Sequence, residues 1–156
     1  MLVITAGRTG PNKSVRFGGD ASLDERGRRD VAALRTVVAG AGRQTRVGVA
    51  AGPERVVAES CAVLQVSPAT SPDLRSLDVG TWAGRAPADI DPDELSVWFT
   101  DPGAHPHGGE SVTRFVERIR RWYRTAGSDV DVCVVAMPVA QALLSPLFLR
   151  MATKYA

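Results

Sequence analysis

The feature of the sequence that most constrains the fold is an apolar run near its end, from Val130 to Ala136, interrupted only by Asp131. A strand buried on both faces carries apolar side chains at successive positions, whereas a half-exposed strand alternates them with polar ones. The run therefore predicts a central strand of a parallel sheet that is covered by helices on both sides.

Shorter apolar runs predict further strands at 2–4 and 47–51, and the chain at 64–66 leads towards another short strand. Between the strands lie helical patterns. In the first of these, Ser22 and Glu25 form a capping box, in which each side chain can bond the other's backbone amide. That helix is expected to end near Gly40.

Pro53 suits the first position of a second helix, and three later helices are expected at 94–99, 111–124 and 139–144. The helix at 111–124 is amphipathic, with Phe115, Ile119 and Trp122 on its core face. Strands that alternate with helices predict an α/β fold, a three-layer sandwich with a mainly parallel central sheet. At 156 residues the chain is expected to form a single domain, 1–156.

Composition excludes several classes of partner. The formal net charge of +2 gives no case for nucleic acid or an anionic membrane surface. No apolar stretch is long enough to span a membrane, and the first strand begins at Leu2, where a signal peptide would otherwise stand. Cys61 and Cys133 lie far apart in apolar surroundings, as reduced thiols of a cytoplasmic protein do.

The loop after the first strand, Thr5-Ala6-Gly7-Arg8-Thr9-Gly10-Pro11-Asn12, resembles the Arg-His-Gly-x-Thr-x-x-Asn motif of the histidine phosphatase, or phosphoglycerate mutase-like, superfamily. Gly7, Thr9 and Asn12 fit the motif. Thr5 stands in place of its phosphate-binding Arg, and Ala6 in place of its nucleophilic His. The frame of the motif is kept and its reactive groups are absent.

Later landmarks of the family follow in the same order. They are Gly52-Pro53 after the second strand, the stretch 73–84 with Gly80, Trp82 and Gly84, the Gly108-Gly109-Glu110-Ser111 segment, and the turn at 136–138. The resemblance implies the family's fold over nearly the whole chain. Most relatives continue with a further strand, so we expect a C-terminally short variant whose sheet edge is absent or supplied by a partner, which leaves a homodimer open.

The resemblance also implies which groups phosphoryl transfer would need. The family uses a His nucleophile, two Arg and a second His that neutralise the phosphoryl oxygens, and an acid that protonates the leaving group. Cationic clamps of this kind stabilise phosphoryl transfer. The corresponding positions in this chain are uncharged: Thr5, Ala6, Val56, Ser76 and Met137.

Some polar residues remain near the expected site. Glu110 and His107 are the candidate catalytic groups, for proton transfer, although an acid at a helix N-terminus also has a purely structural use. Arg8 either directs a cation at the pocket or is a solvated loop residue. The expected ligand-binding residues are Thr5, Ala6, Arg8, Asn12, Val56, Ser76 and Met137. His105 and His107 lack a third ligand nearby, so no metal is expected, and no cofactor is implied.

Three functions compete on this basis. The first is a catalytically degenerate enzyme whose pocket now binds a neutral small molecule for isomerase, cyclase or dehydratase chemistry in specialised metabolism. The second is a pseudophosphatase that binds a ligand or protein partner without turnover. The third, a conventional phosphatase or mutase, conflicts with the missing charged groups.

Overall fold

A parallel four-stranded sheet forms the centre of the molecule in a computed structural model that describes residues 1–10, 16–41 and 48–144. The strands are β1 (Leu2–Thr5), β2 (Val49–Ala51), β3 (Ala69–Thr70) and β4 (Val132–Val135). Their order is β1-β4-β2-β3, and each neighbouring pair is parallel. Asn12, a predicted ligand-binding residue, lies outside the described residues, as does the chain beyond Leu144, where a further sheet edge was in question.

The central strand is β4, as its apolar run predicts. Each of its four side chains is fully buried. Val132 and Val134 belong to one core cluster, whereas Cys133 and Val135 belong to another. Because successive side chains of a strand point to opposite faces, β4 contributes to the core on both sides of the sheet.

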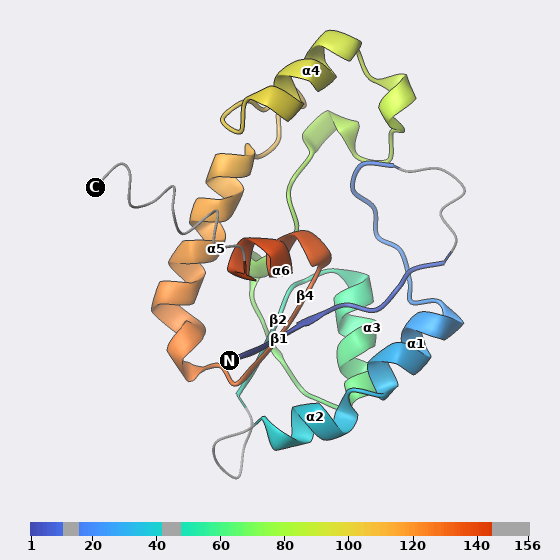
Figure 1. Cartoon of the computed structure of the whole chain (residues 1–156), viewed down its shortest axis with the longest axis vertical. Coiled ribbons are helices and arrows are strands. Elements are labelled where there is room, and N and C mark those ends of the chain that lie inside the picture. The colour runs from blue at the N-terminus through green and yellow to red at the C-terminus, as the bar shows by residue number, and fades with distance from the viewer. Residues whose placement is uncertain (11–15, 42–47, 145–156) are drawn as a thin grey trace.

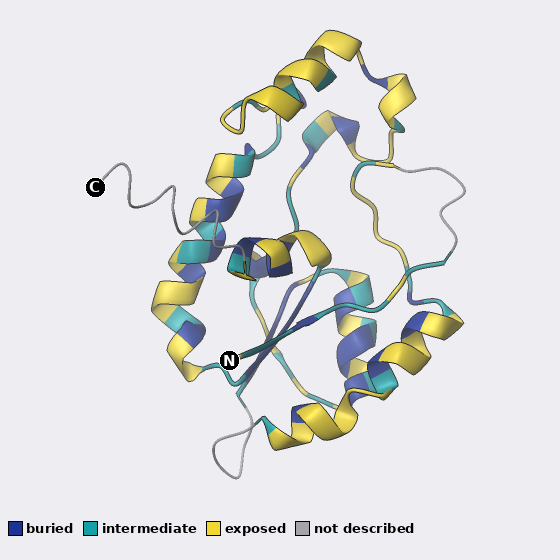
Figure 2. Ribbon diagram, viewed as in Figure 1, coloured by how far each residue is buried: buried dark blue, intermediate teal, exposed yellow. Residues whose placement is uncertain are grey.

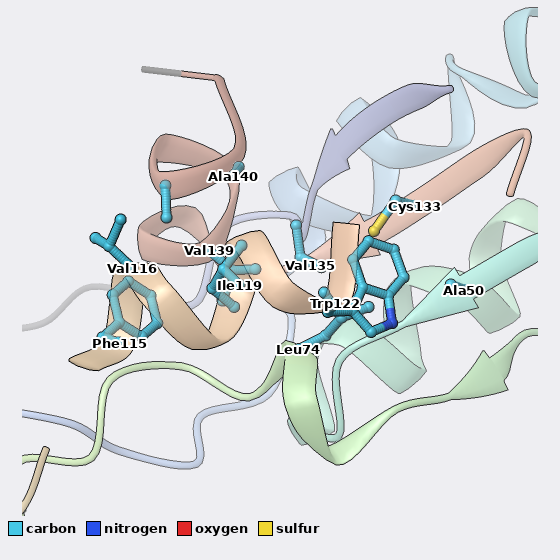
Figure 3. Close-up of a cluster of buried hydrophobic side chains, with 11 residues drawn as sticks. Ala50, Leu74, Phe115, Val116, Ile119, Trp122, Cys133, Val135, Val139 and Ala140 are labelled. Atoms are coloured by element: carbon cyan, nitrogen blue, oxygen red, sulfur yellow. The ribbon is translucent and has the colours of Figure 1, made fainter. Parts of the chain in front are cut away.

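Helices cover both faces (Figure 1). One face packs against α5 (Val112–Ala126) and α6 (Met137–Leu144), and the other against α1 (Glu25–Ala32), α2 (Arg35–Gly40) and α3 (Arg55–Leu64). Figure 3 shows the first of these clusters, with Ile119 of α5, Val139 of α6 and Val135 of β4 among its members. The predicted three-layer α/β sandwich is therefore confirmed.

The helix starts differ from the sequence expectation in two places. The cap of α1 is Asp24, whose carboxylate accepts from the Gly27 amide at 2.6 Å. Ser22 is displaced from this role because the amide of buried Leu23 donates to Glu59 of α3 at 2.8 Å, which keeps the chain extended until Asp24. The sequence predicted one helix in this region, but the structure has two, because α1 ends at Ala32 and α2 begins at Arg35.

In the second case, α3 begins at Arg55 with Glu54 as its cap residue, so Pro53 precedes the helix instead of opening it. The late helices agree better with the sequence. Ser111 caps α5 by accepting from the Arg114 amide at 3.2 Å, and Phe115, Ile119 and Trp122 are buried in the core as predicted.

A smaller unit lies beside the main sandwich. The helix α4 (Pro92–Thr100) is exposed over most of its surface (Figure 2) and contacts a cluster of Val79, Trp82 and Ile90 through Leu95 and Trp98. Both cysteines are buried and unbridged, and burial raises the pKa of Cys61 to about 11 and that of Cys133 to about 12. The prediction of buried thiols is thereby confirmed. Among the described residues, no helix is long and apolar enough to cross a membrane.

The packing of α5 on the sheet predicts the effect of a core truncation. Ile119 is completely buried, so Ile119→Ala should lower the free energy of unfolding by about 2–5 kcal/mol, through lost burial and the cavity left behind. Chemical denaturation measures this change. Arg121→Ala on the exposed face of the same helix is the control, and an equal loss in both variants would contradict the assigned packing.

Candidate functional site

The carboxyl ends of the three main strands meet at one edge of the sheet. Thr5 is in register with Val135, and the Ala6 amide donates to the Val135 carbonyl at 2.8 Å. On the other side of β4, the Gly52 amide donates to the Val134 carbonyl at 3.1 Å. Ligands of open α/β sheets bind outside this edge. Met137 lies two residues after Val135, the last residue of β4.

A buried hydroxyl joins α3, which carries Val56, to the loop after β1. Ser60 of α3 is fully buried and its Oγ donates to the Val56 carbonyl at 2.7 Å. The same oxygen accepts from the Gly7 amide at 3.1 Å. Ala6 and Val56 both pack against the core cluster beneath, so the first turn of α3 lies against the loop that follows β1.

Ser76 reaches the edge through a residue that sequence reasoning missed. Its backbone amide donates to Oε1 of Glu54, which precedes α3. Within the described parts of the chain, the other carboxylate oxygen of Glu54, Oε2, is buried and has no hydrogen-bond partner. The sequence did contain a signal for Glu54: it is an acidic residue at the start of the helix, between Pro53 and Val56, the position that corresponds to the family's second Arg.

We define the carboxyl-edge site as Thr5, Ala6, Glu54, Val56, Ser76 and Met137. Met137 is 57 % exposed, whereas the other five side chains are partly buried. Glu54 is the one charged residue of this set. The neighbouring Arg55 pairs instead with Glu59, to which its Nε donates at 3.1 Å.

Glu110 lies beside this site in a two-pronged ion pair. Its Oε1 and Oε2 accept from Nε and Nη2 of Arg118 at 2.9 and 2.6 Å. Nη1 of Arg118 donates to the carbonyls of Asp73 and Arg75, which lie three residues and one residue before Ser76. Both charges are largely removed from solvent: the Arg118 side chain is 14 % exposed and that of Glu110 is 11 % exposed.

Such paired charges are strong, directional contacts. The pair has no net charge, and both oxygens of Glu110 already accept hydrogen bonds. Its geometry joins the start of α5 to the loop that carries Ser76.

His107 lies in a different environment, the aromatic cluster beneath α4. Its ring centroid is 5.0 Å from that of Trp82 and 4.6 Å from that of Trp98, with both partners edge-on. The residue is 1 % exposed, and its Nδ1 accepts from the Gly109 amide at 3.0 Å. Burial lowers the pKa of His107, the charge of His105 lowers it further, and Asp78 opposes the shift.

Two loops hold His107 by backbone contact. The His107 carbonyl accepts from the Thr81 amide at 3.0 Å, and the Glu110 amide donates to the Asp78 carbonyl at 2.8 Å. Gly80, with φ of +48°, lies so close that a Cβ atom there would overlap the His107 carbonyl. The Gly-Gly-Glu-Ser segment is thus held against the loop at 78–82. His107, which the sequence suggested as a proton-transfer group, is enclosed in the protein interior.

The remaining expectations concern Arg8 and metals. The Arg8 side chain is exposed, and its carbonyl accepts from the Asp24 amide at 3.0 Å. Over residues 1–10, 16–41 and 48–144, no three His, Cys, Asp or Glu residues cluster in a way that could hold a metal ion. An open hollow of about 780 Å³ lies at the opposite edge of the sheet, beside Val38, Val49 and Leu64, and no predicted site residue lines it.

The histidine phosphatase superfamily (branch 1) matches this sequence over residues 2–148, and the chain belongs to that superfamily. No curated protein sequence matches the chain.

Solved structures share the fold. A candidate alpha-ribazole-5'-P phosphatase from Escherichia coli superposes with a TM-score of 0.76 at 20% identity, over 93% of this chain and 77% of that one. A phosphoglycerate mutase from Thermus thermophilus superposes with a TM-score of 0.71 at 23% identity, over 91% of this chain and 80% of that one. The structure called Mycobacterial hydrolase 1 superposes with a TM-score of 0.71 at 24% identity, over 93% of this chain and 76% of that one.

The enclosure of His107 predicts a pH dependence of stability. Its pKa is lower in the folded chain than in the unfolded one, so the unfolded state binds more protons as the pH falls below the ordinary value near 6.5. The free energy of unfolding should therefore drop between about pH 7 and 5. His107→Asn retains a side-chain acceptor for the Gly109 amide and should flatten this slope.

Thermal or denaturant unfolding across that pH range measures the slope. His105→Asn, which changes an exposed histidine two residues earlier, should leave most of it. A slope that disappears in the His105 variant and persists in the His107 variant would contradict the assignment.

Proposed function

We propose that this protein uses the histidine phosphatase fold without phosphatase activity, and that its carboxyl-edge site binds a neutral, partly apolar small molecule. The observation that carries the proposal is the charge of the site. Thr5, Ala6, Val56, Ser76 and Met137 are uncharged, and the added charge, that of Glu54, is negative.

A phosphate ester is poorly matched to such a site. Phosphoryl transfer is stabilised by cations placed around the phosphoryl oxygens, and the residues of the carboxyl-edge site provide none. The Glu54 carboxylate would repel a phosphate dianion. Two like unit charges 4 Å apart repel each other by about 4 kcal/mol at the effective dielectric constant near a protein surface.

A neutral ligand fits the same residues better. Small-molecule sites are lined mainly by apolar side chains, with a few polar groups that fix orientation. Ala6, Val56 and the exposed thioether of Met137 would supply apolar contact. Thr5 and Ser76 would supply hydroxyl groups that both donate and accept hydrogen bonds.

Binding without turnover is the function that the geometry supports best. Both oxygens of Glu110 accept from Arg118, and His107 is enclosed by two tryptophan rings. These contacts suit residues that hold loops together. The alternative within this function is that the site binds a protein partner instead of a small molecule.

The second candidate is acid–base chemistry of the isomerase, cyclase or dehydratase type on the same neutral ligand. One observation favours it: the Glu54 carboxylate has an oxygen without a partner among the described residues and lies beside the uncharged positions. A carboxyl group in such surroundings can transfer a proton to or from a bound molecule. Glu54 would then take the part that the sequence suggested for Glu110 or His107.

The proposal predicts an inert protein towards phosphate esters. The purified chain should not hydrolyse p-nitrophenyl phosphate, and vanadate at millimolar concentration should not raise its melting temperature, because a ligand stabilises only the state that it binds. Hydrolysis that disappears in Thr5→Ala but persists in the surface variant Arg121→Ala would overturn the proposal. This pair of variants separates the activity of the site from that of a contaminating phosphatase.

A further inference from the structure

Four aromatic rings from four separate segments of the chain meet beneath α4. The ring centroid of Trp82 lies 5.2 Å from that of Phe17 and 6.0 Å from that of Trp98, and the His107 ring contacts both tryptophans. We call these four residues the aromatic cluster. Because α4 packs here through Trp98 and Leu95, the cluster attaches this exposed helix to the main sandwich.

His107 is the titratable member of the aromatic cluster, and the structure holds its ring in the neutral form. Its Nδ1 accepts from the Gly109 amide at 3.0 Å, so this nitrogen carries no proton and the proton of the neutral ring is on Nε2. Nε2 is buried, and among the described residues no hydrogen-bond partner reaches it. The interior therefore offers no acceptor to either nitrogen of a charged ring.

A second proton on His107 would conflict with this arrangement in two ways. It would bind to Nδ1, towards which the Gly109 N–H already points, so two donors would face each other and their hydrogen bond would be lost. The positive charge would also be desolvated, because the residue is 1 % exposed. Burial accordingly lowers the pKa of His107.

The charges around His107 do not compensate for this burial. On the same loop, the charge of the exposed His105 lowers the pKa of His107 further. On the neighbouring loop, Asp78 opposes the shift, but its Oδ1 already accepts from the Gly80 amide at 2.9 Å. α4 presents the indole of Trp98 to the ring. Among the described residues, no carboxylate forms an ion pair with His107.

We propose that His107 is a pH-operated latch, which holds α4 against the main sandwich while its ring is neutral and releases α4 when the ring gains a second proton. Water would solvate the charged ring once the aromatic cluster opens, whereas the closed cluster excludes water. Since the open form binds the extra proton more readily, acidification favours the open form. This inference does not depend on the ligand assigned to the carboxyl-edge site.

The segments that the latch joins lead to the carboxyl-edge site. Phe17 packs on Trp82, and three residues later Asp20 accepts from the Arg55 amide at 3.2 Å, in the first turn of α3. The loop that carries Trp82 follows Ser76 in the chain. Opening of the aromatic cluster would therefore loosen two segments next to the site, and acid would change access to it.

The three tryptophans of the chain can report on the latch. Trp82 and Trp98 belong to the aromatic cluster, whereas Trp122 lies in the core of the main sandwich. In fluorine NMR of protein labelled with fluorotryptophan, the signals of Trp82 and Trp98 should move towards that of exposed tryptophan between about pH 7 and 5, while the Trp122 signal stays in place. The open-to-closed ratio should rise by at most about tenfold per pH unit, as a single proton requires.

His107→Asn retains an acceptor for the Gly109 amide and does not titrate in this range, so both cluster signals should stay at their neutral-pH positions. His105→Asn is the matched control and should keep the transition. If the His107 variant does not fold, the wild-type protein decides the question by nitrogen NMR of its labelled histidines. The His107 ring should carry its proton on Nε2 at neutral pH and should gain the second proton at the pH where the cluster opens.

Three results would overturn the latch. The first is a transition that persists in His107→Asn, and the second is a pair of cluster signals that stay constant while the His107 ring becomes charged. The third is a simultaneous change of all three tryptophans, because acid would then unfold the main sandwich together with α4. The experiment uses no ligand, so failure of the latch leaves the proposed function untouched.

Discussion

The position of β4 between β1 and β2 is the constraint on which the rest of the structure depends. Its side chains are fully buried and contribute to the core on both faces. Because all neighbouring strands are parallel to it, their carboxyl ends lie together. The backbone bonds from Ala6 and Gly52 to the last residues of β4 fix the loops that follow β1 and β2. Any site at this edge is therefore built on rigid backbone.

Local patterns were enough to predict this framework. The apolar run at 130–136 identified the central strand, and the spacing of Phe115, Ile119 and Trp122 identified a helix on one face. The errors occurred where tertiary contacts override local preference. Ser22 is a good cap in isolation, but the bond from the Leu23 amide to Glu59 moves the cap to Asp24.

The site was less predictable than the fold, for the same reason. Aligned positions identified Thr5, Ala6, Val56, Ser76 and Met137, all of which lie at or directly beside the carboxyl ends of the strands or are tied to them through Ser60 and Glu54. The environments of Glu110 and Glu54 depend on partners far along the chain, and no spacing rule shows them. Arg118 appears as one of several arginines along a helix, yet its contacts with Glu110 and two carbonyls bury it.

On the proposed function, this member of the superfamily differs from a phosphate-binding one in the charge of its site, on a fold that the family shares. The loops that surround the edge are held by backbone bonds and small residues, such as Gly80 against the His107 carbonyl. The groups that would face a ligand are uncharged or negative. On that proposal, the change would alter which molecules bind and would leave the core packing in place.

The most direct test of this account restores the charges on the existing framework. A variant with Thr5→Arg, Ala6→His, Val56→Arg, Ser76→Glu and Met137→His in a Glu54→Gln background should bind tungstate in a calorimetric titration. Ala6→His alone should not, because groups that act as a unit contribute little singly. Tungstate binding by the Ala6 variant, or its absence from a folded variant that carries all the changes, would contradict the claim that charge alone separates this site from a phosphate site.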